Sequence, residues 1–178
     1  MAPPATIHRV RIDLSDVDRG VYEALDFRVA RHPSETLRFM LTRILAYALA
    51  YEEGIAFSKA GLHDSDEPPV AIHDPTGASP QLRVWIDVGS PAAPRLHKAA
   101  KSAKAVRIFT HSELASLRAE AASIHKASTI AVTTIAPAFL DALEGHVERQ
   151  ITLQLLRNEG VLYATVASGE TFETPLRE

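Results

Sequence analysis

The chain contains no cysteine, so disulfides, thiolate metal sites and cysteine nucleophiles are all excluded. Its first residues, MAPPATIHRVRIDLSD, lack the cationic and then apolar order of a secretory signal peptide. No apolar run approaches the roughly 18–20 residues that a membrane-spanning helix needs. We therefore expect a cytoplasmic protein that makes no membrane contact.

Several well-known catalytic and nucleotide-binding motifs are also missing. The sequence has no G-x-x-x-x-G-K-[ST] phosphate loop, no G-x-G-x-x-G dinucleotide turn, no G-x-S-x-G nucleophile elbow and no H-E-x-x-H zinc helix. These absences leave several common classes of nucleotide-binding protein, hydrolase and metalloprotease without sequence support.

The composition is that of one folded domain covering residues 1–178, with 46% hydrophobic and 23% charged residues. The net charge of −3 does not suit a protein that coats nucleic acid. Any contact with nucleic acid would require a local basic face.

Alternating apolar residues predict a strand hairpin from residues 5–14 and 21–30. A helix over residues 35–52 follows, with Ser34 as its expected cap. Residues 55–80 are rich in acids, prolines and glycines and predict a loop with short strands at 55–58 and 70–73.

The stretch from 81 to 89 predicts a central strand, because apolar residues occur on both of its faces. Strands and helices then alternate, and a final hairpin turns at residues 158–160. This order predicts a mixed α/β fold with a single mixed sheet between helices and antiparallel hairpins at both ends.

Three acids are candidate metal ligands. Asp66 and Glu67 lie in the loop before the central strand, and Asp87 lies near the end of that strand. Adjacent strands could bring them together, and clustered carboxylates repel one another unless a cation or a proton lies between them. Oxygen ligands of this kind favour Mg²⁺ or Mn²⁺. Alternatively, Asp66 is a turn residue and Asp87 caps backbone donors at the strand end.

The helix expected over residues 94–104 carries a basic stripe made of Arg95, Lys98 and Lys101. A lysine here could hold a phosphate or stabilise developing negative charge, or the stripe could be an ordinary solvated helix face. Glu35, in the first turn of the long helix, suits the helix dipole. It could also point into the same cleft as the other acids.

Five stretches together resemble the YaeQ family of small bacterial proteins: ARHPSET (30–36), DEP (66–68), VWIDVGSP (84–91), HKAAKSA (97–103) and VRIFTHS (106–112). The resemblance spans nearly the whole chain. It implies a variant of the PD-(D/E)XK, or restriction-endonuclease-like, fold. That fold places a mixed sheet between helices and carries a metal-dependent phosphodiesterase site.

Under this resemblance, Asp66 or its neighbour Glu67 corresponds to the first metal-binding acid, and Asp87 to the acid of the (D/E)xK element. The motif expects a lysine two residues later, where this chain has Gly89. Lys98 on the following helix is the candidate substitute, and Glu35 corresponds to the acid of the first core helix. The implied catalytic set is Asp66, Asp87 and Lys98, with Mg²⁺ or Mn²⁺ held by Asp66, Glu67, Asp87 and Glu35.

Three functional interpretations follow. The first is a metal-dependent nuclease or related phosphodiesterase. The second is a non-catalytic module that keeps the fold and binds nucleic acid or a protein through Arg95, Lys98 and Lys101, an interpretation that Gly89 favours. The third is a small structural protein whose acids and lysines are solvated.

Overall fold

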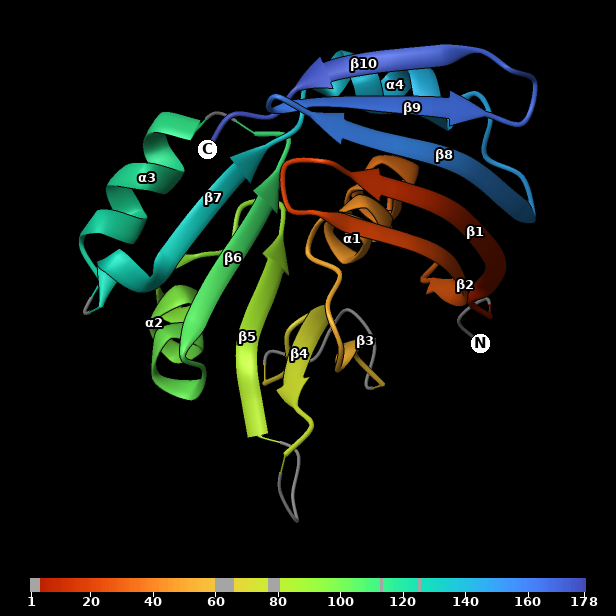
Figure 1. Ribbon diagram of the computed structural model, residues 1–178. Coiled ribbons are helices and arrows are strands. Elements are labelled where there is room, and N and C mark those ends of the chain that lie inside the picture. Colours follow the sequence, from red (N-terminus) through yellow and green to blue (C-terminus); the bar gives the residue numbers. More distant parts are fainter. Residues whose placement is uncertain (1–3, 60–65, 77–80, 113, 125) are drawn as a thin grey trace.

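The computed structural model describes residues 4–59, 66–76, 81–112, 114–124 and 126–178. Its strands form two five-stranded sheets, which lie on either side of helix α1 (Leu37–Leu49) (Figure 1). The predicted mixed α/β fold is confirmed, but the prediction of a single mixed sheet is wrong. The two terminal hairpins pair with each other instead of extending the central sheet.

Sheet A joins both ends of the chain. The first hairpin, β1 (Thr6–Asp16) and β2 (Val21–Arg31), pairs in parallel with β8 (Gln150–Asn158), which continues into β9 (Val161–Val166) and β10 (Thr171–Pro175). The predicted turn at residues 158–160 is confirmed, with positive φ at Glu159 and Gly160. Strand β10 has no counterpart among the predicted elements.

Sheet B holds the central strand. Its order is β3 (Ile55–Phe57), β4 (Val70–Asp74), β5 (Gln81–Val88), β6 (Ala105–Thr110) and β7 (Ile130–Thr134). Strands β5, β6 and β7 run parallel, and β3 and β4 add antiparallel pairs. Helices α2 (Ala93–Ser102) and α3 (Leu114–Ala122) connect the parallel strands and cover one face (Figure 1).

Helix α1 fills the space between the sheets. Met40, Leu41, Ile44 and Leu45 are buried there against strand residues of both sheets, and α4 (Pro137–Glu144) packs beside α1. The helix begins later than expected because Thr36 is its cap: the Thr36 hydroxyl accepts a hydrogen bond from the Phe39 N–H at 3.1 Å. The predicted cap, Ser34, instead contacts the His32 ring.

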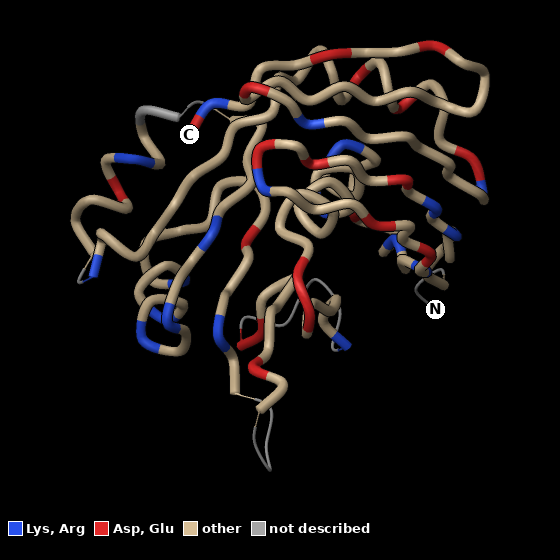
Figure 2. Tube along the Cα trace, viewed as in Figure 1, with Lys and Arg blue, Asp and Glu red and all other residues tan. Residues whose placement is uncertain are grey.

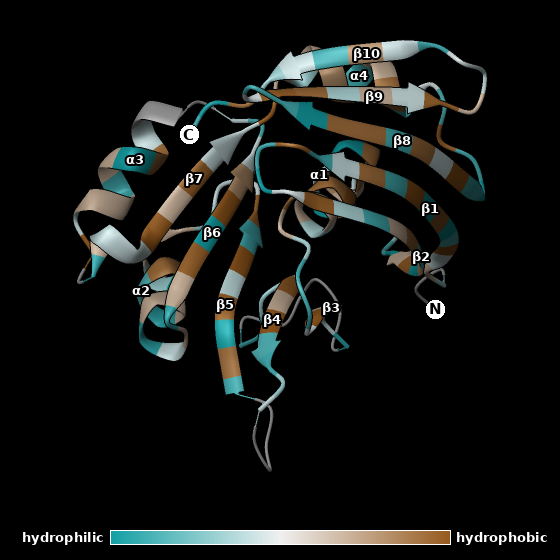
Figure 3. Cartoon of the chain, viewed as in Figure 1, coloured by the Kyte–Doolittle hydropathy of each residue, from teal (hydrophilic) through white to brown (hydrophobic). Residues whose placement is uncertain are grey.

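The other face of sheet B has its own apolar cluster. Trp85 from β5 packs with Leu96, Ala99 and Ala100 of α2 and with strand residues of β6 and β7. Apolar positions are visible along β5, β6 and β7 in Figure 3. Sheet B is thus covered by α1 on one face and by α2 and α3 on the other. In the described part of the chain, no helix has the length and apolar character required to cross a bilayer.

Candidate active site at the end of strand β5

Asp87 is the second-to-last residue of β5, and its side chain lies on the face covered by α2. Alternation along the strand puts it on the same face as Trp85, while Ile86 and Val88 face α1. Asp87 is only 3% exposed. A buried carboxylate is costly unless it is paired or hydrogen-bonded, so its contacts determine what it can do.

Three donors surround this carboxylate. The Trp85 indole N–H donates to Asp87 Oδ2 at 3.0 Å, and Arg95 Nε donates to the same oxygen at 2.7 Å. The backbone N–H of Val88 lies 3.3 Å from Asp87 Oδ1. The Arg95 guanidinium also lies over the Trp85 ring, 5.3 Å from its centroid. Arg95 is therefore the counter-ion of Asp87 in this structure, through a short charge-assisted bond.

Asp66 and Glu67 lie at the same end of β5 as Asp87. Strand β4 begins at Val70, which pairs with Ile86, so the segment before β4 lies next to the end of β5. Arg95 joins the two parts, since its Nη2 donates to the Glu67 carbonyl at 3.1 Å. The backbone of the segment with Asp66 and Glu67 therefore lies beside the end of β5.

Helix α2 places basic side chains beside these acids. Lys98 forms an ion pair with Asp66. The Glu67 carboxylate accepts a hydrogen bond from the Ser58 hydroxyl at 2.8 Å. The third basic residue of the stripe, Lys101, is exposed in the last turn of α2. The helix therefore brings Lys98 to Asp66.

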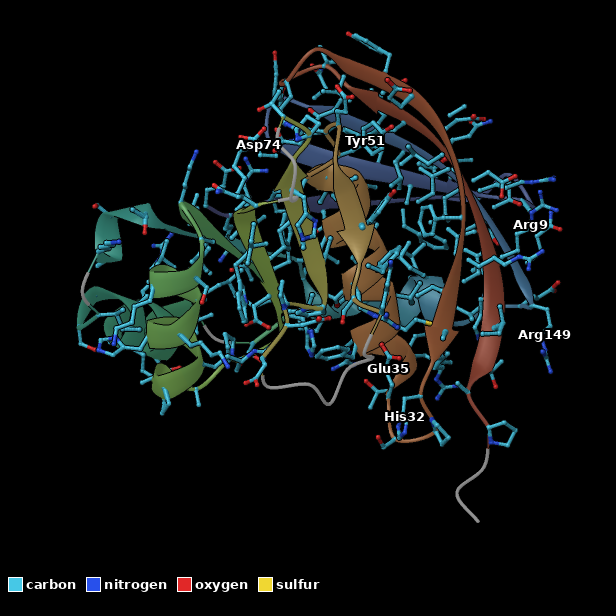
Figure 4. All side chains as sticks on the ribbon, turned by 90° about the horizontal axis from the view of Figure 1, so that it is seen from below. Arg9, His32, Glu35, Tyr51, Asp74 and Arg149 are labelled. Carbon is cyan, nitrogen blue, oxygen red and sulfur yellow. The ribbon has the colours of Figure 1, made fainter. Side chains whose placement is uncertain are left out.

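Glu35 occupies a different environment. Its carboxylate is bound by Arg43 of α1, with Nη2 to Oε2 at 3.0 Å and Nε to Oε1 at 3.2 Å, and by the His32 N–H. Figure 4 shows Glu35 and His32 at one end of α1, opposite the end that carries Tyr51. Burial raises the pKa of the Glu35 carboxyl even though Arg43 opposes that change. None of the hydrogen bonds or ion pairs among the described residues connects Glu35 with Asp66, Glu67 or Asp87.

Gly89, two residues after Asp87, has a backbone conformation that disfavours any side chain. Its φ of +83° is a conformation that L side chains rarely adopt, and a Cβ there would lie 3.4 Å from the Phe39 ring. Its N–H donates to the Phe109 carbonyl at 2.9 Å, which fixes this turn against β6. A lysine at this position would be strained. A cationic side chain can reach the acids from α2 instead.

Sequence reasoning missed the Trp85–Asp87–Arg95 contact. The sequence predicts Arg95 on the basic stripe of the helix, but it does not connect this arginine with Asp87. The available signal was the short connection between β5 and α2, which starts the helix directly beside the strand end. Such a connection makes a contact between the first turn of the helix and the last strand residues easy to form.

The side chains that the structure describes contain no ready-made metal site. No group of three or more His, Asp or Glu residues in those parts is arranged to hold a metal ion. The oxygen donors of Asp66, Glu67 and Asp87 are of the type that Mg²⁺ prefers. Asp87 Oδ2 is occupied by two donors, so a cation at this oxygen would compete with Arg95.

The family model described as "YaeQ protein" matches residues 1–174. The chain belongs to the YaeQ family. A protein of Escherichia coli (strain K12) named "Uncharacterized protein YaeQ" is 29% identical over 167 residues, covering 92% of this chain and 90% of the relative. The Salmonella typhi protein of the same name is 28% identical over 171 residues, covering 94% and 92%.

Solved YaeQ structures share the fold described above. The crystal structure of the YaeQ protein from Pseudomonas syringae superposes with a TM-score of 0.85 at 30% identity, covering 99% of this chain and 96% of that one. The YaeQ protein from Xanthomonas axonopodis pv. citri gives a TM-score of 0.85 at 25% identity, covering 97% and 96%. The arrangement of two mixed sheets with flanking helices is therefore that of YaeQ proteins.

Proposed function

We propose that this YaeQ family member is a metal-dependent phosphodiester hydrolase of nuclease type, with sheet B as its restriction-endonuclease-like core. One observation supports this most. The segment with Asp66 and Glu67, just before β4, lies at the same end of sheet B as Asp87 on β5, and Lys98 of α2 pairs with Asp66. Acids and a lysine gathered at one end of a sheet can serve metal binding and phosphate chemistry.

In this proposal, Asp87 and either Asp66 or Glu67 hold Mg²⁺ or Mn²⁺. The metal would supply Lewis acidity at the phosphoryl oxygen and a lowered pKa for bound water. Lys98 orients the attacking water and stabilises negative charge on the phosphate. Glu35 stays outside the proposed ligand set, because its carboxylate is already paired with Arg43.

Arg95 has a defined part in the proposal. Its side chain is 23% exposed, and its Nη2 also donates to the Glu67 carbonyl at 3.1 Å. Metal binding would replace the Arg95–Asp87 ion pair, and the released guanidinium would then be available to a substrate phosphate. This exchange predicts that removing Arg95 strengthens metal binding.

The test is calorimetric titration with Mn²⁺ on the wild type, Asp87→Asn and Arg95→Gln. We expect micromolar binding by the wild type, tighter binding by Arg95→Gln and no binding by Asp87→Asn. Asn keeps the shape of the buried side chain, and Asp13→Asn, exposed on the outer face of β1, is the matched control. Equal Mn²⁺ binding by wild type and Asp87→Asn, or no binding by either, would contradict the proposed metal site.

Cleavage is tested separately on single- and double-stranded DNA and RNA with Mg²⁺ or Mn²⁺. Lys98→Ala is expected to retain Mn²⁺ binding and to lose hydrolysis by about a hundredfold or more. Lys101→Ala, on the same helix but exposed in its last turn, is expected to retain activity. A wild type that binds Mn²⁺ but cleaves none of these substrates would rule out nuclease activity.

The second candidate is a non-catalytic module that binds nucleic acid through Arg95, Lys98 and Lys101. The observation that favours it is the Arg95–Asp87 ion pair, which neutralises the carboxylate without a metal. It predicts metal-independent binding of a nucleic acid strand that is lost on charge reversal at Lys98 and Lys101. Unchanged binding by that double variant would contradict this candidate.

A further inference from the structure

A cleft of about 770 Å³ lies where the β1–β2 turn, strands β6 and β7, helix α3 and the C-terminal residues meet. Its charged lining consists of four arginines, Arg19, Arg107, Arg118 and Arg157, and one acid, Glu178. Basic positions along β6 and α3 are visible in Figure 2 on the side of the molecule where the C-terminus lies. The four arginines come from four separate elements or turns.

This cleft is distinct from the site at Asp87. Arg107 lies on β6 beside Ile86 in the strand register, whereas Asp87 lies beside Ile108. Ile86 and Phe109 belong to the core between the sheets, and Ile108 belongs to the cluster under α2. Arg107 and Asp87 are therefore on opposite faces of sheet B, and each site can be altered without touching the other.

Two of the four arginines are held by the protein itself. Arg19 donates to the Leu49 carbonyl and, at 2.8 Å, to the Tyr51 carbonyl. Arg157 Nε lies 3.2 Å from Asp18, and its Nη2 lies 2.9 Å from Glu178. These bonds fix two guanidiniums at the wall of the cleft, and the buried Asp16 also lies 3.5 Å from Arg19.

Arg107 is held much less tightly. Its nearest carboxylate is Glu52, at 3.7 Å, which is beyond hydrogen-bonding distance. The guanidinium makes no hydrogen bond with the residues that the structure describes, and its side chain is 36% exposed. Burial lowers the pKa of Arg107, and the neighbouring Arg19 and Arg83 charges lower it further, against the opposing effect of Glu52. A half-buried cation with repelling neighbours and unused donors is stabilised by an added anion.

Arg118 provides a second set of donors. It is exposed on α3, and no hydrogen bond or ion pair connects it to other described residues. The rest of the lining is largely apolar and includes Leu49, Phe109, Val132 and Leu176. Guanidinium donors beside apolar walls suit a ligand that has both an anionic group and an apolar body.

We propose that this cleft binds a small ligand in which a phosphate group is joined to an apolar or aromatic body, such as a nucleotide. Arginine forks match phosphate oxygens in geometry and charge. The cleft volume falls in the range of small-molecule sites, about 300–1,000 Å³. The C-terminal residues cross the end of β7, with the Thr134 N–H bonded to the Arg177 carbonyl at 2.8 Å, and so bound the cleft at that end.

The experiment is calorimetric titration of the full chain with AMP, inorganic phosphate and a short single-stranded oligonucleotide. The wild type is expected to bind AMP with a Kd of about 1 mM or lower, and inorganic phosphate more weakly because it lacks the apolar body. Arg107→Gln and Arg118→Gln should each weaken AMP binding by about tenfold or more. Because Arg118 is exposed, Arg118→Gln is expected to fold normally. It therefore tests the proposal even if Arg107→Gln folds poorly.

Arg28→Gln is the matched control, since it removes the same charge from an exposed position on β2. It should bind AMP like the wild type, as should Lys98→Ala, which separates this cleft from the site at Asp87. Absence of AMP binding, equal weakening by Arg28→Gln, or binding of the oligonucleotide without AMP would overturn the proposal.

Discussion

At the scale of single residues, the ion pair between Glu35 and Arg43 is the most deeply buried one in the described part of the chain. The two residues are 5% and 6% exposed, and Arg43 also donates to the Ala30 carbonyl at 2.8 Å. The pair thus ties the end of β2 and the following loop to α1. Burial lowers the pKa of the Arg43 guanidinium as it raises that of Glu35. Each charge is tolerated here because the other is present.

Removing only Arg43 is therefore expected to be costly and dependent on pH. Arg43→Met leaves Glu35 buried without its counter-ion and should lower the free energy of unfolding by about 3–5 kcal/mol near neutral pH. The folded-state pKa of Glu35, already raised above its ordinary value of 4.5, would rise further. The stability of the variant is therefore greatest below the pKa that Glu35 has in the unfolded chain, and it is lost as the pH rises through the pKa that Glu35 has in the folded protein.

Urea unfolding at about pH 8 and about pH 5 measures this dependence. The deficit of Arg43→Met relative to the wild type should be smaller at the lower pH, where Glu35 is protonated. In Glu35→Gln/Arg43→Met, which has no buried charge at either position, the deficit should change little with pH. A deficit of the single variant that is the same at both pH values would mean that Glu35 is not the source of the cost.

The connection between α1 and β3 depends on Gly54. It has a φ of +89°, and a Cβ at this position would lie 2.3 Å from the His73 carbonyl oxygen. The Gly54 carbonyl accepts a hydrogen bond from the His73 N–H at 3.0 Å. The absence of a side chain lets the backbone approach β4 closely, so this glycine sets the distance between the end of α1 and sheet B.

Gly54→Ala and Gly20→Ala separate the two effects of such a substitution. Gly20 also has a positive φ, of +68°, but nothing lies within 4 Å of its added Cβ. Gly20→Ala should cost only the backbone strain, about 1–2 kcal/mol. Gly54→Ala adds a clash with the backbone and should cost about 2–5 kcal/mol in chemical denaturation. Equal losses in the two variants would show that the close approach to His73 has no energetic weight.

At the scale of the whole molecule, the two sheets share one core. Residues of β1, β2, β8 and β9 in sheet A and of β4 and β5 in sheet B belong to a single buried cluster that includes α1. Neither sheet can keep its inner face buried if α1 leaves. We therefore expect the sheets to unfold together in a single cooperative transition.

Trp85 allows this cooperativity to be measured. It is the only tryptophan in the sequence, and it is fully buried on the α2 face of sheet B. Ile12→Ala, a change in the core of sheet A, should lower the free energy of unfolding by about 2–5 kcal/mol. Tryptophan fluorescence and far-ultraviolet circular dichroism should report the same shift. A fluorescence transition unchanged by Ile12→Ala would show that sheet A unfolds independently.

The local elements of this fold were readable from the sequence because side-chain periodicity is a local property. Alternation identified β1, β2 and β5, and the Asn158-Glu159-Gly160 turn identified the last hairpin. The short strand β10 escaped notice because Thr171–Pro175 carries little apolar alternation. For the candidate site, the order of strand, short turn and helix was enough to predict that Lys98 follows β5 on a helix, and the structure pairs this lysine with Asp66.

Only the tertiary structure decided which strands share a sheet and which charges meet. The parallel pairing of β1 with β8 joins opposite ends of the chain and places Arg9 beside Gln150. Figure 4 labels Arg9 and Arg149, which point outward. The tertiary structure also decided that Arg95 pairs with Asp87 and that Arg43 pairs with Glu35. A sequence pattern predicts which face of a helix or strand is buried. The partner of that face is selected by packing both sheets around one helix, which depends on the whole chain at once.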